Sequence, residues 1–101
     1  MLKLENNLFE SIKHYDEAGN EYWSARELQK GLEYNTWQKF QVIVNKAMIS
    51  CENSKFNVSD HFIQVGKMVN IGSKTTRSIR DYKLSRYACY LIAQNGDSRK
   101  K

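Results

Sequence analysis

The sequence has no proline, only two cysteines and no long hydrophobic run. The cysteines, Cys51 and Cys89, are too few for a disulfide scaffold, and each falls in a segment of helical pattern, where a free buried thiol is common. No apolar run approaches the roughly 20 residues that a membrane helix needs. The first residues lack the apolar core and cleavage site of a signal peptide. We therefore expect a cytoplasmic protein that does not contact a membrane.

Recognisable catalytic and metal-binding motifs are also missing. The two histidines, His14 and His61, form no closely spaced pair with the cysteines, so nothing indicates a zinc site. The stretch GSKT at residues 72–75 fails the phosphate-loop pattern, because Gly66 lies six residues before Gly72 rather than five and a serine occupies the lysine position. No nucleophile elbow or H-E-x-x-H motif is present. We expect no metal, no cofactor and no catalytic residue.

Positive charge is concentrated in the last third of the chain. The formal net charge is +5. Residues 1–65 hold seven Lys/Arg against nine Asp/Glu, a net of −2, whereas residues 66–101 hold nine against two, a net of +7. The composition is otherwise that of an ordinary globular domain. An anionic partner is therefore expected to bind the last third rather than the first two.

Side-chain periodicity predicts a small single α+β domain. Three helices are expected to begin after a capping residue, namely Ser24, Thr36 or Ser85, and Ser24 with Glu27 forms a capping-box pattern. The strands fall into hairpins, without the long crossover that a parallel sheet requires. Residues 52–60 are polar and predict a loop. The expected order is α-β-β-α-α-β-β-α, with helices at about 4–13, 25–31, 37–51 and 86–95 and strands at about 14–15, 21–23, 62–71 and 77–84.

Residues 24–47 resemble a helix-turn-helix, with Gly31 in the short turn. The second helix carries polar side chains away from its apolar stripe. Gln and Asn can make paired hydrogen bonds to adenine edges, and Lys can reach guanine or phosphate. A plain scaffold helix is the alternative, because every surface helix has a polar outer face. The candidate groove-contacting residues are Gln38, Lys39, Asn45 and Lys46.

The predicted hairpin at residues 62–84 has the sequence SKTT at its tip and is strongly basic. Side chains alternate between faces of a strand, so neither face is wholly basic. The cations can nevertheless converge on a phosphate backbone, and a helix-turn-helix followed by a basic hairpin is the outline of a winged helix. Lysines on edge strands also protect against aggregation, which is the alternative. The candidate phosphate-contacting residues are Lys74, Arg77, Arg80, Lys83 and Arg86.

Arg86 is an unusual case within this set. It falls in the first turn of a Ser-capped helix, beside the positive end of the helix dipole, where a cation is unfavourable. We therefore expect a salt bridge or a bound anion close to Arg86.

Several stretches of the chain resemble the DNA-damage-inducible protein D family of bacteria. They are EYWSARELQKGLEY, the W-x-x-F that follows it, DHF at residues 60–62 and above all RDYKLSRYACYLIAQNGD. Proteins of that family begin with a domain of the BRO-N type, which is also found in phage antirepressors. The resemblance implies that residues 1–101 form one BRO-N-like DNA-binding domain, that family members continue beyond Asp97, and that the family acts in the SOS response. It supplies no catalytic residues.

Two functional hypotheses follow. The first is a non-catalytic DNA-binding module of a bacterial DNA-damage response or of a phage-type regulatory protein. The second is a protein-interaction domain that modulates a recombination or repair factor with little direct DNA contact, which the acidic first two-thirds of the chain favours. Whether the DNA is single- or double-stranded stays open. A homodimer also stays open, because proteins that read half-sites usually dimerise.

Overall fold

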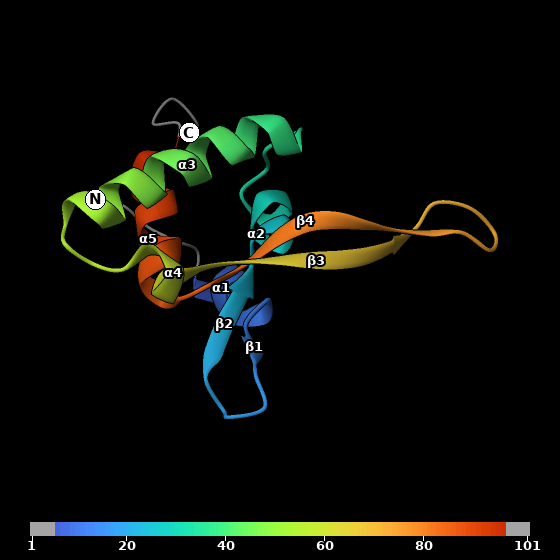
Figure 1. Cartoon of the computed structure of the whole chain (residues 1–101), viewed down its shortest axis with the longest axis horizontal. Coiled ribbons are helices and arrows are strands. Elements are labelled where there is room, and N and C mark those ends of the chain that lie inside the picture. The colour runs from blue at the N-terminus through green and yellow to red at the C-terminus, as the bar shows by residue number, and fades with distance from the viewer. Residues whose placement is uncertain (1–5, 97–101) are drawn as a thin grey trace.

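The computed structural model describes residues 6–96 and has the predicted α+β fold. Figure 1 shows a body of helices and short strands from which one long hairpin projects. The predicted order of elements is confirmed, with one additional short helix, α4. The elements are α1 (Asn6–Ser11), β1 (His14–Tyr15), β2 (Glu21–Ser24), α2 (Ala25–Gly31), α3 (Trp37–Asn53), α4 (Val58–His61), β3 (Phe62–Asn70), β4 (Thr76–Leu84) and α5 (Arg86–Asn95).

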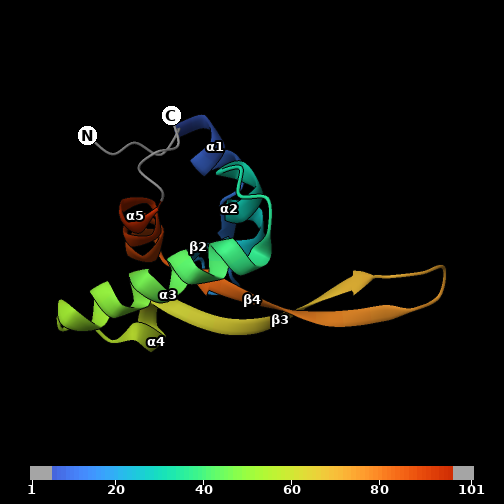
Figure 2. The ribbon, with the colours of Figure 1, turned by 90° about the horizontal axis from the view of Figure 1, so that it is seen from above.

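The four strands form one antiparallel sheet in the order β1-β2-β4-β3. Strand β2 pairs with β4 only through Trp23↔Leu84 and Ser24↔Lys83, at the base of the hairpin. Strands β3 and β4 pair along their whole length, from Phe62↔Leu84 to Asn70↔Thr76. The outer part of the hairpin is therefore a two-stranded ribbon, which extends away from the body in both views (Figures 1 and 2).

The core lies between α2, α3, α5 and the base of the sheet, where α5 packs beside α3 (Figure 2). Burying a large apolar side chain contributes about 1.5–3 kcal/mol to folding. Apolar residues spaced three and four apart are buried on α3, namely Phe40, Val44, Ala47 and Cys51, and on α5, namely Ala88, Leu91 and Ile92. The largest fully buried side chains are Trp23, Phe40, Leu28, Leu84, Ile92, Val44, Cys51 and Cys89.

All three predicted N-caps are formed. The hydroxyl of Ser24 accepts a hydrogen bond from the backbone N–H of residue 27, that of Thr36 from residue 39, and that of Ser85 from residue 88. The capping box itself is only half formed. The Glu27 carboxylate lies 2.8 Å from Nε2 of His14 instead, because β1 runs past the first turn of α2 and supplies a competing partner.

The prediction of a loop over residues 52–60 was wrong at both ends. Helix α3 continues to Asn53, because Cys51 is buried and keeps its last turn packed on the core. Helix α4 is a single turn that begins at Val58, whose side chain packs against the core. The polar composition of the segment therefore concealed the influence of buried Cys51 just before it and of half-buried Val58 within it.

Gly31 is the last residue of α2 and leads into the turn before α3. Glu33, rather than the glycine, has the positive φ of 66° in this connection. A Cβ atom on Gly31 would lie only 2.7 Å from Cδ1 of Leu8. The glycine is therefore explained by the close approach of the Leu8 side chain to the end of α2.

Candidate nucleic-acid interface

The outer part of the β3–β4 hairpin carries positive charge only. Residues 62–80 include four cations, Lys67, Lys74, Arg77 and Arg80, and no acidic residue. At about 3.3 Å per residue, strands of this length reach roughly 25–30 Å. Because β2 stops at the base, the ribbon is open to solvent on both faces and along both edges. A polyanion can therefore reach these cations from several directions.

The strand register divides the hairpin side chains between two faces. Residues paired directly across an antiparallel ladder point to the same side. The face that we call the aliphatic face consists of the pairs Ile63↔Lys83, Val65↔Asp81, Lys67↔Ile79 and Val69↔Arg77. The face that we call the polar face consists of Phe62↔Leu84 and Gln64↔Tyr82 near the base and of Gly66↔Arg80, Met68↔Ser78 and Asn70↔Thr76 farther out.

This register distributes the predicted phosphate-contacting residues unevenly. Arg77 and Lys83 share the aliphatic face, Arg80 lies on the polar face, and Lys74 lies in the loop at the tip. Lys67, which the sequence analysis did not select, lies on the aliphatic face diagonally across from Arg77. In the sequence, Lys67 lies among apolar residues. Only the pairing of β3 with β4 shows that it lies beside Arg77.

The single acid of the hairpin is turned into the body. Asp81 is 4% exposed, and its carboxylate accepts hydrogen bonds from the Ser24 hydroxyl at 2.7 Å and from the backbone N–H groups of Arg26 at 3.0 Å and Tyr82 at 2.8 Å. A buried carboxylate must be satisfied in this way to be tolerated. Asp81 therefore joins β4 to the start of α2, and the hairpin shows no exposed carboxylate to an approaching phosphate.

Arg26 reinforces the same junction. Its Nε donates a hydrogen bond to the backbone carbonyl of Arg80 at 2.7 Å. This carbonyl lies on the edge of β4 just beyond the end of β2, so Arg26 supplies the partner that β2 does not. Its guanidinium lies 3.8 Å from the centre of the Trp37 ring, a cation–π contact. Burial lowers the pKa of Arg26, and the charge of Asp81 acts in the opposite direction. The base of the hairpin is thus held rigidly against α2 and α3.

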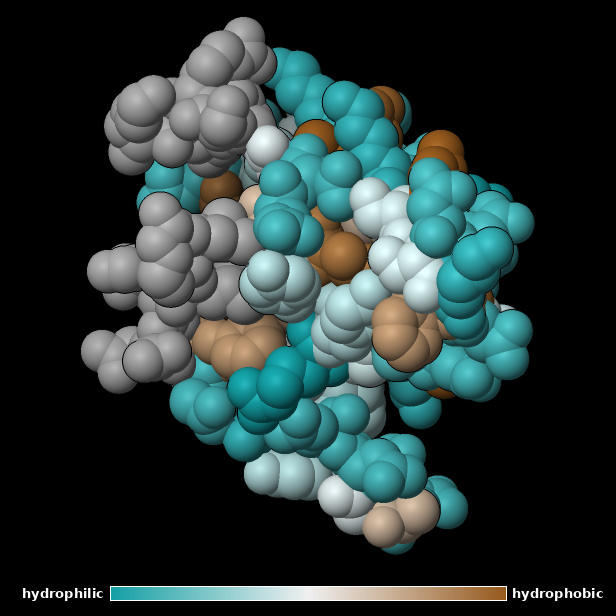
Figure 3. All heavy atoms as spheres, turned by 90° about the vertical axis from the view of Figure 1, so that its left-hand side faces the viewer, coloured by the Kyte–Doolittle hydropathy of each residue, from teal (hydrophilic) through white to brown (hydrophobic). Residues whose placement is uncertain are grey.

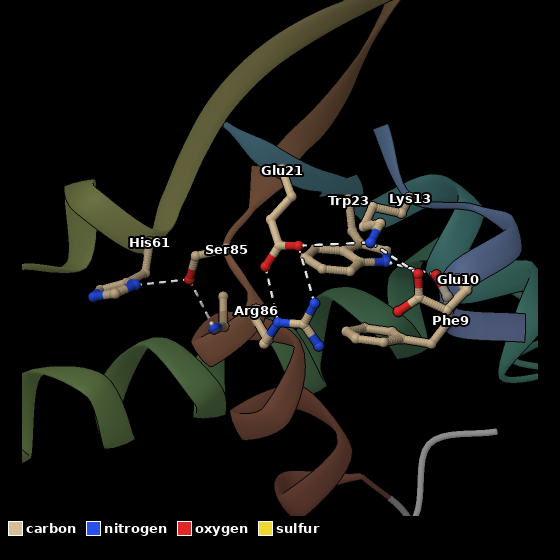
Figure 4. A network of polar contacts seen from close by, with 9 residues as sticks. Phe9, Glu10, Lys13, Glu21, Trp23, His61, Ser85 and Arg86 are labelled. Carbon is tan, nitrogen blue, oxygen red and sulfur yellow. Dashed lines mark hydrogen bonds and ion pairs between the residues drawn. The ribbon is translucent and has the colours of Figure 1, made fainter. Parts of the chain in front are cut away.

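Arg86 forms the salt bridge that its position led us to expect. Its Nε and one terminal nitrogen donate to the two oxygens of Glu21 at 2.8 and 2.9 Å, a bidentate pair (Figure 4). These bonds raise the pKa of Arg86 and lower that of Glu21. The guanidinium also lies 5.3 Å from the ring centres of Phe9 and Trp23. Contact between Arg86 and phosphate stays a prediction.

Lys83 borders a hollow at the base of the aliphatic face. The hollow measures about 240 Å³ and is lined by β1, β2, α2 and both strands of the hairpin. Nζ of Lys83 lies 4.8 Å from the centre of the Tyr22 ring, and Tyr22 stacks on His14. Because Glu27 also lines the hollow, its charges are mixed. It is less suited to a phosphate than the outer ribbon.

The outer face of α3 holds the four candidate groove-contacting residues. Gln38, Lys39, Asn45 and Lys46 are all exposed, as a groove-contacting role requires. Asn45 is partly engaged, since its Oδ1 accepts from Nε2 of Gln41 at 3.1 Å. That face also bears the exposed apolar residues Val42 and Ile49. Its mixture of residues is compatible with groove contact and with an ordinary solvent-facing helix.

Figure 3 shows the end of the molecule opposite to the hairpin, where the described residues are mainly hydrophilic and the hydrophobic ones form small separate patches. Both cysteines are buried and free, as predicted. In the described part of the chain, no helix is long and apolar enough to cross a membrane.

Comparison with known proteins defines the class of protein to which this chain belongs. The chain belongs to the BRO family, whose N-terminal domain model matches residues 11–101. Within that class it is similar to the DNA damage-inducible protein D of Escherichia coli (strain K12), with 47% identity over 92 residues that make up 91% of this chain. The chain spans 34% of the length of that relative. No solved structure matches the chain.

Proposed function

We propose that this domain is a non-catalytic DNA-binding module of a cytoplasmic bacterial protein that acts in the DNA-damage response or in phage-type regulation. One observation carries the proposal: the projecting hairpin exposes several cations and no carboxylate. The BRO-family membership and the similarity to a damage-inducible protein support the biological setting. The hairpin lies on the phosphate backbone and supplies most of the affinity.

Five residues make the phosphate contacts in this proposal, and they are not equivalent. Lys74, Arg77 and Arg80 lie on the outer ribbon and bind most strongly. Lys83 contributes from the base. Arg86 is the weakest member, because two of its guanidinium nitrogens already donate to Glu21. Lys67 joins the set as a sixth cation, because it lies on the same face as Arg77.

The test of the phosphate contacts is fluorescence anisotropy with labelled DNA across a salt series. Binding through several phosphates must weaken linearly in log–log form, with a slope of about −0.9 per contact on duplex DNA. We expect a slope of about −3 or steeper for the native chain. The double variant Arg77→Glu/Arg80→Glu should flatten that slope by about 1.8. The matched control is Lys30→Glu, a charge reversal at an exposed position of α2, which should change it little.

Helix α3 is proposed as the second contact, through its exposed Gln38, Lys39, Asn45 and Lys46. A base contact changes sequence preference, whereas a phosphate contact changes affinity for all sequences alike. Asn45→Ala should therefore lower affinity only for a preferred sequence, by about 1–3 kcal/mol. A uniform loss over random duplexes would make Asn45 a backbone contact rather than a base contact, and no loss would remove Asn45 from the interface.

A protein-interaction domain is the alternative function, and the exposed acidic turn between β1 and β2 favours it. Asp16 and Glu17 both lie there, and residues 1–65 carry a net charge of −2. The partner would be a recombination or repair factor with a basic surface. A partner that is retained on the immobilised domain after nuclease treatment, and lost with Asp16→Lys/Glu17→Lys, would support this alternative.

A further inference from the structure

We propose that Met68 and Ile71, at the outer end of the β3–β4 hairpin, are apolar wedges that enter the minor groove of duplex DNA and kink it. The inference rests on the proposed DNA-binding function. It adds the form of the DNA, the groove that is occupied and the distortion that results.

The two side chains are exposed and make no contribution to the core. Met68 is 63% exposed and Ile71 is 54% exposed, and neither belongs to the buried core or to the residues packed against it. The hairpin itself does not bury Met68, which lies directly opposite Ser78. By contrast, Val69 and Ile79 on the aliphatic face are half-buried. Folding therefore does not explain why residues 68 and 71 are apolar.

The position of Ile71 suits insertion into a groove. It is the first residue after β3, and its backbone N–H donates to the carbonyl of Thr75 at 3.0 Å, which closes the loop. The side chain is thus carried at the leading end of a ribbon whose base is fixed by Asp81 and Arg26. Ile and Met are among the side chains that minor-groove proteins insert between base steps.

The charges around the wedges select DNA over a second copy of this chain. Arg80 lies diagonally across from Met68 on the polar face, and Lys74 lies in the loop that begins with Ile71. Lys67 and Arg77 lie on the opposite face of the ribbon, and residues 62–80 contain no acid. Two copies meeting at this ribbon would bring like charges together without compensation. A duplex offers the opposite: phosphates along both edges of the groove for the cations, and apolar sugar and base surfaces between them for the aliphatic side chains.

Entry of the ribbon into the minor groove requires the distortion. Two paired strands lie about 4.8 Å apart before their side chains are counted, and the undistorted minor groove is only about 6 Å wide. The ribbon therefore enters only where the groove opens. Inserting a wedge between base steps bends the duplex toward the major groove, which provides that opening.

The test is energy transfer between dyes at the two ends of a duplex of about 25 base pairs, measured alongside anisotropy on the same duplex. The native chain should raise the transfer efficiency on binding. Met68→Ser/Ile71→Ser should abolish that rise and weaken binding about tenfold, as expected for losing apolar contacts, while the salt slope is retained. Tyr90→Ser is the matched control, because Tyr90 is 49% exposed on α5, outside both the ribbon and α3, and it should behave as the native chain. Circular dichroism verifies that all variants are folded.

The possible failures are distinguishable. A chain that binds duplex without any change in energy transfer, or whose double variant still bends it, would overturn the wedge while leaving the proposed function intact. Binding that netropsin, a minor-groove ligand, does not displace would overturn the choice of groove. Binding to single strands alone would overturn the whole inference. Absence of any DNA binding at low salt would refute the proposed function itself.

Discussion

The charged residues of the body and those of the outer hairpin differ in whether they form ion pairs. In the body, Arg86 pairs with Glu21 and Lys13 with Glu10, each at 2.8 Å. Among residues 6–96, none of the cations of the outer hairpin has such a partner. Ion pairing and burial thus stabilise the body, whereas the ribbon leaves its cations available. Changes in the body should alter stability, and changes in the ribbon should alter binding.

The largest effect on stability is expected for Asp81→Ala. The substitution leaves the Ser24 hydroxyl and two backbone N–H groups without their acceptor, and each buried donor left unsatisfied costs about 1–3 kcal/mol. We expect the free energy of unfolding to fall by about 3 kcal/mol or more in urea titrations. Glu17→Ala, at an exposed turn, is the control and should change it by less than about 0.5 kcal/mol. Equal effects of the two variants would contradict the role of Asp81.

A smaller loss is expected for Ser85→Ala. The Ser85 hydroxyl caps α5 by accepting from the N–H of Ala88 at 3.0 Å and also lies 2.7 Å from Nδ1 of His61 (Figure 4). Loss of an N-cap costs about 1–2 kcal/mol. Thermal unfolding should show a lower Tm for this variant than for Ser59→Ala, which alters an exposed serine. If the two variants have the same Tm, the cap does not stabilise α5.

A still smaller, pH-dependent effect is expected from Glu21. Its bonds to Arg86 lower its pKa below the ordinary value of 4.5. The pair therefore contributes its full stability above pH 4.5 and loses it as the pH falls through the lowered pKa of the folded state. The Tm difference between the native chain and Glu21→Gln should shrink as the pH is taken from 6 toward about 3. A difference that grows on acidification would contradict this assignment.

The smallest effect on stability is expected from shortening the hairpin. Residues 67–79 would be replaced by Asn-Gly, a pair that favours a tight turn between strands. The removed residues lie outside the core, so the free energy of unfolding should change by about 1 kcal/mol or less. The control is the native chain in the same urea titration. Collapse of the fold would show that the ribbon is part of the body after all.

Local signals explain which parts of the fold were predictable from the sequence. Ser24, Thr36 and Ser85 marked helix starts correctly, because a cap depends only on the next few residues. Helix α4 was missed, because it is one turn long and depends on a contact of Val58 with the core. The partner of the Glu27 carboxylate was missed for the same reason, since His14 reaches it through the tertiary structure.

The candidate site was predictable in its location but not in its arrangement. The count of cations identified the hairpin, whereas the grouping of Lys67 with Arg77 needed the register of β3 against β4. Asp81 is the single acid within a basic stretch of the sequence, and only the meeting of β4 with α2 shows that it is buried. Whether the cations contact phosphate stays a prediction that only binding data can test.

The most direct test of the central claim is the DNA affinity of the hairpin-shortened chain beside that of the native chain, measured by anisotropy as a function of salt. The account predicts that the native chain binds with a slope of about −3 or steeper. The shortened chain, still folded, should bind more weakly with a slope flatter by about 2.7, because Lys67, Lys74 and Arg77 are removed while Arg80 and Lys83 remain. A folded, shortened chain that binds DNA as tightly as the native chain, with the same slope, would contradict it.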